Sequence, residues 1–331
     1  PEKQAAVEIE RLLKYPGFLK RDTFAKGRVE IVELRVNKDS LLCNHTLADL
    51  DSVVGCKVLI CAVLRNGSAV APDGNYTLLA GDRIFVTAPT DTLETLLKNL
   101  KVITHKVRRV LLCGGGRLSY YLAKQLDQSG IAVRLIEQDY DRCLQLANLL
   151  PGVTVIQGDA SDERLLESEG MDDCDALVTM TGIDELNMVI SLQGTIRKVP
   201  QVITKLGRMD NSYILDQLPI GSTVSPKQLC CNTIVRYVRA LHNQEGAALS
   251  VHTIADGQAE ALEFCVDDDT RHIGEPLKKL HLKKNVLIVC ITHKGKQEIP
   301  GGDSYYEKGD TVIVVTSRDA VIYQLNDIFE A

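Results

Sequence analysis

The strongest constraint on the fold of this chain is an internal repeat. The segment Val29–Leu50 aligns with Ala259–Leu280, and Val58–Asp82 aligns more closely with Val286–Asp310. Both copies of the second segment end in Gly-Asp. Two matched segments in the same order indicate one folding unit that is used twice, so the chain contains two similar small domains.

Each copy has the pattern of a small α+β domain. Short apolar runs alternate with turn residues, and Asn66-Gly67 between two such runs is typical of a β-hairpin turn. The predicted order in the first copy is a strand, a helix, three strands and a final helix. The predicted strands include 29–36, 58–64 and 84–87, and the predicted helices are 41–50 and 90–100.

The segment between the two copies alternates strictly between apolar strands and helices. Strands that are apolar throughout are covered on both faces, and in such an alternating chain they form a parallel sheet. The predicted fold class is therefore α/β, a Rossmann-like doubly wound parallel sheet flanked by two small α+β domains. The predicted strands are 110–113, 132–137, 153–157, 176–180, 201–205 and 223–224, and the predicted helices are 118–128, 140–149, 163–169, 185–195 and 212–218.

The repeat also includes the helix that precedes each copy. Pro1-Glu2-Lys3-Gln4 resembles Pro226-Lys227-Gln228, and more than a hundred residues with an alternating strand and helix pattern precede Pro226 but not Pro1. We therefore expect the parent protein to carry a further domain of that kind, roughly 125 residues long, ahead of Pro1. The predicted domains are 1–27 as crossover helices left from a truncated first module, 28–101 as the first small domain, 107–225 as the Rossmann-like domain, 226–257 as a crossover helix and 258–331 as the second small domain.

The helix predicted at the start of the chain has an apolar stripe. Without a domain of its own to cover it, we expect this stripe to recruit a neighbouring chain, to fray, or to fold against the first small domain. The residues of the stripe are Val7, Ile9, Leu12 and Leu13.

Composition excludes several classes of protein. Hydrophobic residues make up 45% of the chain and charged residues 25%, which is typical of globular domains. A formal net charge of −6 provides no basic field for nucleic acid. Apolar runs are strand-length and do not approach the roughly 20 residues of a membrane helix. The ten cysteines include no Cys-x-x-Cys pair and the seven histidines form no cluster, so no metal site is predicted.

A glycine loop follows the first strand of the alternating segment. Val110–Cys113 leads into Gly114-Gly115-Gly116-Arg117-Leu118-Ser119 and then into a helix. A phosphate group needs exposed backbone N–H groups at a helix N-terminus, and glycines let the chain approach it closely. Gly114 and Gly116 fit the first two positions of the dinucleotide fingerprint. Ser119 replaces the third glycine, which predicts a slightly looser contact between helix and strand.

Further polar residues follow the next strands. Glu137 ends the second strand about twenty residues after the loop, where a carboxylate accepts both ribose hydroxyls and repels a 2′-phosphate. This favours NAD(H) or an adenine nucleotide over NADP. Asp184 and Glu185 could equally cap a helix. The predicted cofactor-binding residues are Gly114, Gly116, Arg117, Leu118, Glu137, Gln138, Asp159, Ala160, Thr179, Thr181, Asp184 and Asn187.

The strand ends lack the usual equipment of an enzyme. Lys205 is the only candidate proton carrier near them, and the small domains carry no paired carboxylates or nucleophile. We therefore predict a binding protein with no catalytic residues. An NAD-dependent oxidoreductase is the alternative, and a structural scaffold with a vestigial pocket is a third hypothesis.

These residues resemble a known family. Val110–Pro226, with the glycine loop, Glu137, Gly158-Asp159-Ala160 and the run Thr181–Asn187, resembles the RCK-type domain that regulates potassium conductance. The small domains, with their Gly-Asp ends, are similar to the C-terminal domain of the same modules. Order, spacing and duplication together resemble the TrkA-like regulatory subunits of bacterial Trk potassium uptake systems.

The resemblance implies a function and a location. It implies a cytoplasmic homo-oligomer, peripheral to the inner face of the cell membrane, which gates a membrane-embedded potassium-translocating subunit when NAD(H) or ATP/ADP binds. Gly114, Gly116 and Arg117 would hold phosphates, Glu137 the ribose, and Asp159-Ala160 the adenosine end. In some relatives the small domains bind a second small molecule, and the resemblance leaves open whether these two do.

Overall fold

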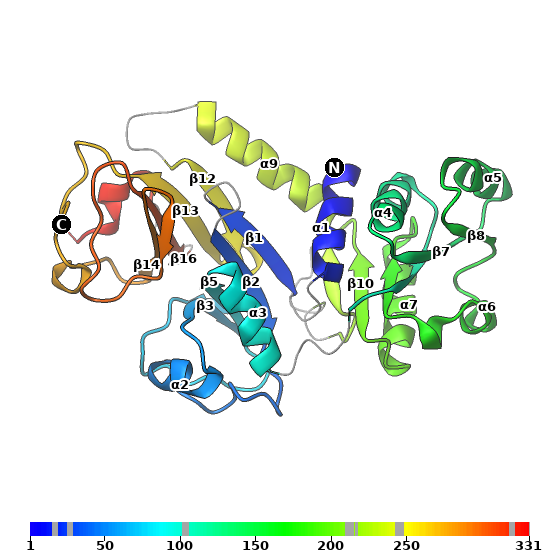
Figure 1. Cartoon of the computed structure of the whole chain (residues 1–331), viewed down its shortest axis with the longest axis horizontal. Helices are drawn as coiled ribbons and strands as arrows, with labels where there is room; N and C mark the ends of the chain where they lie inside the picture. The colour runs from blue at the N-terminus through cyan, green and yellow to red at the C-terminus, as the bar shows by residue number, and fades with distance from the viewer. Residues whose placement is uncertain are drawn as a thin grey trace. The chain divides into compact units, whose positions relative to one another are not determined.

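The computed structural model describes residues 1–14, 19–24, 29–100, 106–208, 215, 218–241, 248–317 and 322–330 (Figure 1). The chain divides into two compact units, each built from two separate stretches. Unit 1 comprises Pro1–Leu19 and Ile103–Cys231, and unit 2 comprises Lys20–Val102 and Asn232–Ala331.

Unit 1 is built on a six-stranded parallel sheet with the order β11-β10-β9-β6-β7-β8. Chain order reverses between β6 and β9, which makes this the switch point of a doubly wound fold. The strands are β6 Arg109–Cys113, β7 Ala132–Glu137, β8 Thr154–Gln157, β9 Ala176–Thr179, β10 Gln201–Lys205 and β11 Ser222–Val224, and the helices are α1 Glu2–Lys14, α4 Arg117–Gln128, α5 Tyr140–Leu149, α6 Glu163–Ser168, α7 Asp184–Ile196 and the start of α9 Pro226–Leu241.

Successive residues of the central strand β6 enter two different cores. Val110 and Leu112 pack with α1, α4 and α5, whereas Leu111 and Cys113 pack with α6 and α7. Each face of the sheet is therefore covered, which explains why these strands are apolar throughout. The predicted α/β class with a Rossmann-like parallel sheet is confirmed.

Helix α1 belongs to unit 1, and its apolar stripe is buried in the core of that unit. Ile9, Leu12 and Leu13 are almost fully buried in the same core as Leu122 of α4, and Gln201 donates from Nε2 to the carbonyl oxygen of Leu12 at 2.7 Å. The three outcomes expected from the sequence, which were recruitment of a neighbouring chain, fraying, and folding against the first small domain, are therefore wrong. The α4 face of unit 1 supplies the apolar surface that the stripe requires.

Unit 2 contains two antiparallel five-stranded sheets of identical topology. Their orders, β1-β2-β5-β3-β4 and β12-β13-β16-β14-β15, match strand for strand. The first sheet contains β1 Lys20–Phe24, β2 Val29–Arg35, β3 Leu59–Arg65, β4 Ser68–Val70 and β5 Arg83–Ala88, with α2 Leu50–Val54 and α3 Thr90–Asn99; the second contains β12 Ser250–Ile254, β13 Ala259–Cys265, β14 Val286–His293, β15 Lys296–Glu298 and β16 Thr311–Ser317, with the 3-10 turns Leu277–Lys279 and Leu325–Ile328.

The repeat extends to local irregularities of the backbone. The pairing of β3 with β5 shifts between Ile60 and Ala62, and that of β14 with β16 shifts between Ile288 and Cys290, at the aligned position. Asn66 and Gly67 both have positive φ, as the predicted hairpin turn requires. One face of each sheet contributes to a shared apolar core, in which Phe85 of the first sheet and Ile313 of the second are buried.

Two predictions about the secondary structure need correction, and a third falls largely where the structure is not described. The helix predicted at 41–50 is wrong at its start, where residues 41–44 form turns and Asn44 donates its backbone N–H to the carbonyl oxygen of Leu78; residues 47–49 form a 3-10 turn, and α2 begins only at Leu50. The crossover segments 1–27 and 226–257 are not purely helical, because they contain β1 and β12, which pair with β2 and β13. The helix predicted at 212–218 lies largely outside the described residues.

A candidate nucleotide-binding cleft

A cleft of about 1330 Å³ lies in unit 1 at the carboxyl ends of β6, β7, β9 and β10. This is the switch point of the sheet, where doubly wound folds bind their ligands. Ten of the twelve predicted binding residues line it: Gly114, Gly116, Arg117, Leu118, Glu137, Gln138, Asp159, Ala160, Thr181 and Asp184.

The three loop glycines have different physical reasons to be glycine. Gly114 has φ +101°, and a Cβ there would lie 2.9 Å from the backbone of Met180. A Cβ on Gly115 would lie 2.7 Å from Oε2 of Glu137. A Cβ on Gly116 would meet nothing within 4 Å, so this residue borders open space. The first two positions therefore close the loop, and the third leaves room for a ligand.

The start of α4 has the properties of an anion site. Gly116 is its N-cap and has no side chain, so it does not cap the first N–H groups of the helix. Free N–H groups and the positive end of a helix attract phosphate. Ser119, the departure from the fingerprint, is fully buried under this turn, and within the described part of the chain its hydroxyl has no hydrogen-bond partner.

Glu137 is held at the cleft by two backbone groups. Its carboxylate accepts from the N–H of Gly115 at 2.5 Å and from that of Asp139 at 2.8 Å. A carboxylate has about four lone-pair sites, so two acceptor positions remain for hydroxyl donors. The loop and the acid at the end of β7 are thus tied together, which places an anionic hydrogen-bond acceptor beside the start of α4.

The turn after β8 brings a second carboxylate to the cleft. Asp159 accepts the backbone N–H of Ser161 at 2.8 Å, and this hydrogen bond holds the pKa of Asp159 below its usual value. A Cβ on Gly158 would lie 2.4 Å from a methyl group of Leu165, so the turn is tightly packed against α6. Asp159 therefore stays ionised near neutral pH and presents an acceptor, not a donor.

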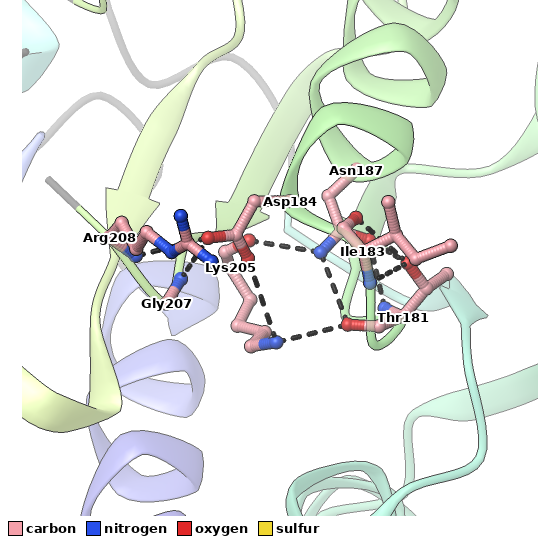
Figure 2. A network of polar contacts seen from close by, with 7 residues as sticks. All are labelled: Thr181, Ile183, Asp184, Asn187, Lys205, Gly207 and Arg208. Atoms are coloured by element: carbon pink, nitrogen blue, oxygen red, sulfur yellow. Dashed lines mark hydrogen bonds and ion pairs between the residues drawn. The ribbon is translucent and has the colours of Figure 1, made fainter.

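Asn187 anchors a polar network that joins the ends of β9 and β10 (Figure 2). Its Oδ1 accepts from the N–H of Thr181 at 2.8 Å and from the hydroxyl of Thr181 at 2.7 Å. Its Nδ2 donates to the carbonyl oxygens of Thr181 and Lys205, at 3.3 and 3.0 Å. Because Asn187 is fully buried, these bonds fix the two strand ends against α7.

Asp184 and Lys205 extend the same network (Figure 2). The Asp184 carboxylate accepts the N–H groups of Gly207 and Arg208 at 2.8 and 3.0 Å, and it lies 3.9 Å from Nζ of Lys205. That Nζ donates to the carbonyl oxygen of Thr181 at 3.0 Å. Asp184, the first residue of α7, therefore also holds the segment that follows β10 through hydrogen bonds to its backbone.

Two predicted binding residues do not line the cleft. Thr179 is fully buried, with its hydroxyl 2.9 Å from that of Ser191 on α7, and Asn187 faces the network described above. Both follow or end a strand at the correct edge, but their side chains point into the packing between sheet and helix.

Sequence reasoning missed several residues of the cleft wall. Pro1, Glu2 at the start of α1, and the first residues of α9 also contribute to it. No local pattern marks these positions, because α1 reaches the cleft only through its packing on α4. The lining residues with polar or reactive side chains that were not predicted to bind the cofactor are Glu2, Glu185, Lys205, Arg208, Lys227, Cys230 and Cys231.

Among the described residues, no three His, Cys, Asp or Glu side chains gather in a way that would hold a metal ion. In the same part of the chain, no helix has the length and apolar character needed to cross a membrane.

Comparison with known proteins places the chain in a family. Residues 110–226 match the TrkA-N domain and residues 31–101 match the TrkA-C domain. A TrkA homolog of the Trk potassium uptake system from Archaeoglobus fulgidus is 30% identical over 331 residues, covering 99% of this chain and 72% of the relative. The chain belongs to the TrkA family. A homolog from Methanosarcina mazei is 28% identical (97% and 70% covered), and TrkA of Haemophilus influenzae is 26% identical (100% and 72% covered).

Solved structures share the fold of this TrkA-family chain. The GsuK RCK domain aligns with a TM-score of 0.51 at 14% identity, covering 96% of this chain and 68% of the other. A GsuK channel structure described as bound to NAD aligns with a TM-score of 0.51 at 15% identity, covering 95% and 56%. The recognition of TrkA-type and RCK-type modules from the sequence is confirmed.

Proposed function

We propose that this TrkA-family chain is a regulatory subunit of a potassium uptake system and binds NAD(H) in the cleft of unit 1. The observation that carries the proposal is the start of α4, where uncapped N–H groups and the open side of Gly116 lie next to the Glu137 carboxylate. A dinucleotide needs an anion site and a ribose acceptor side by side. ATP and ADP carry the same adenosine and phosphate groups and are the alternative ligands.

The residues fit such a ligand without any catalytic partner. Bound nucleotide would place its phosphates at the α4 N-terminus and Arg117, and its ribose hydroxyls at Glu137. Lys205 donates to the Thr181 carbonyl and lies near Asp184, so it has the role of a structural cation. We therefore propose binding without turnover, and a hydride-transfer assay over simple hydroxy acids and alcohols with NAD tests this point. Sustained reduction of NAD would favour an oxidoreductase instead.

The gating role is the further part of the proposal. It rests on the names of the relatives, which are components of Trk potassium uptake systems. We propose a cytoplasmic homo-oligomer that sits against a membrane-embedded potassium-translocating subunit and shifts its conformation on binding nucleotide. A ligand shifts such an equilibrium only by its difference in affinity for the two states. Ile234 and Tyr237 on α9 are 55% and 66% exposed, which favours self-association.

Substitution of Gly116 tests the binding proposal. Gly116 has φ −64° and an open Cβ direction, so Gly116→Val leaves the fold intact while filling the space for a phosphate. We expect the melting temperature to fall by no more than a few degrees, since valine is a poorer N-cap than glycine, and the affinity for NADH, followed by fluorescence titration, to fall at least tenfold. The matched control is Gln128→Val, at the end of α4 away from the cleft. Gly130, which follows this helix, does not serve as a control because its φ of +73° would strain a valine. Wild-type affinity in the Gly116 variant would refute the proposed phosphate position.

A further inference from the structure

The cleft wall contains an acidic residue in an unexpected place. Glu2, in the first turn of α1, lines the cleft together with Arg117, and its Oε1 lies 3.7 Å from Nη2 of Arg117. Arg117 is the loop arginine expected to meet the phosphates, and its side chain is 83% exposed. A carboxylate at this position repels a phosphate group, so its presence beside an anion site is unexpected.

The position of Glu2 is fixed by the fold. The buried face of α1 packs on α4, and Gln201 holds the other end of α1 through the carbonyl oxygen of Leu12. Helix packing therefore presents Glu2 to the start of α4. The pKa of Glu2 lies below its usual value, first because its carboxylate accepts a backbone N–H and then because Arg117 is close, so the group is ionised near neutral pH.

The internal repeat provides a comparison within the same cleft. Lys227 follows Pro226 at the start of α9 as Glu2 follows Pro1 at the start of α1, and both side chains line the cleft. The two aligned helix starts thus bring opposite charges to one site. Since Lys227 occupies the equivalent position at the start of α9, a helix start of this kind does not need a glutamate such as Glu2 in order to fold.

We infer that Glu2 is a specificity-determining residue that makes the cleft disfavour nucleotides with more negative charge. Glu2 forms an ion pair with Arg117, and its negative charge repels phosphates that approach the α4 N-terminus. NADH carries a diphosphate with two negative charges, whereas ATP carries up to four, so the repulsion acts more strongly on ATP. This inference rests on the proposed nucleotide-binding function.

The experiment compares the affinities for NADH and for ATP without magnesium, by isothermal titration calorimetry at low salt. For Glu2→Gln we expect about a twofold gain in NADH affinity and about a fourfold gain in ATP affinity, because the Coulomb energy doubles when the ligand charge doubles. Glu2→Lys should continue the same trend, and added salt should reduce all these gains. The matched control is Glu10→Gln on the same helix, since Glu10 pairs with Lys14 at 2.8 Å and does not line the cleft.

The outcomes distinguish a failure of nucleotide binding from a failure of the role of Glu2. If the wild-type chain binds neither nucleotide, the proposed function fails and this inference fails with it. If both bind but Glu2→Gln leaves the ratio of the two affinities unchanged, or if Glu10→Gln changes it equally, only the role of Glu2 is overturned. A rise in ATP affinity over NADH affinity that is specific to position 2 supports it.

Discussion

Replacement of Asn187 by leucine gives a sharp test of how the cleft is built. Asn187 makes hydrogen bonds with Thr181 and Lys205 at 2.7, 2.8, 3.0 and 3.3 Å and has no exposed surface. Leucine has a similar size but no polar atoms, so Asn187→Leu leaves the Thr181 N–H and the Lys205 carbonyl oxygen without their side-chain partner. A buried polar group without a partner costs about 1–3 kcal/mol.

The expected loss follows from these contacts. With two backbone groups affected and some relaxation of the loop, the free energy of unfolding should fall by about 3 kcal/mol. For a unit of this size that corresponds to a melting temperature lower by roughly 6–12 °C. Circular dichroism of the full chain follows the thermal transition, and Asn148→Leu on the exposed side of α5 is the matched control, expected to change stability by less than about 0.5 kcal/mol. Equal melting temperatures for the two variants would refute the anchoring role of the network.

Two further predictions concern ligand choice and thiol chemistry. NADPH should bind roughly tenfold more weakly than NADH because Glu137 opposes the 2′-phosphate, and Glu137→Gln should narrow this gap; equal wild-type affinities would contradict the ribose role. Burial raises the pKa of both Cys113 and Cys174 to about 12, so these thiols should resist a maleimide at neutral pH, whereas exposed Cys231 reacts and is protected by bound NADH. Mass spectrometry of labelled peptides checks this, and labelling of Cys231 unaffected by NADH would exclude it from the occupied cleft.

The parts of the fold that were predicted correctly are those with strong local patterns. The alternation of apolar strands and helices after Arg109 predicts the parallel sheet. Asn66-Gly67 predicts the hairpin between β3 and β4, because few other residues tolerate two successive positive φ values. The edge strands β1 and β12 were missed. They lie at sheet edges and owe their conformation to pairing with β2 and β13, which no periodicity within a five-residue strand can indicate.

In the candidate site, too, the residues with a local sequence pattern were predicted, and those placed by tertiary packing were not. Gly114, Gly116 and Glu137 were found because loop spacing and strand ends are properties of consecutive residues. The orientation of Thr179 and Asn187 into the interior depends on side-chain partners from α7 and β10, which the sequence alone does not provide. Glu2 reaches the cleft only through the packing of α1 on α4, so no motif points to it.

The most direct test of the account is a crystal structure of the chain with NADH. We expect the diphosphate at the N-terminus of α4 beside Gly116 and the adenosine ribose hydroxyls within hydrogen-bond distance of Glu137. Nucleotide bound elsewhere on the chain, or bound here with its ribose away from Glu137, would contradict it.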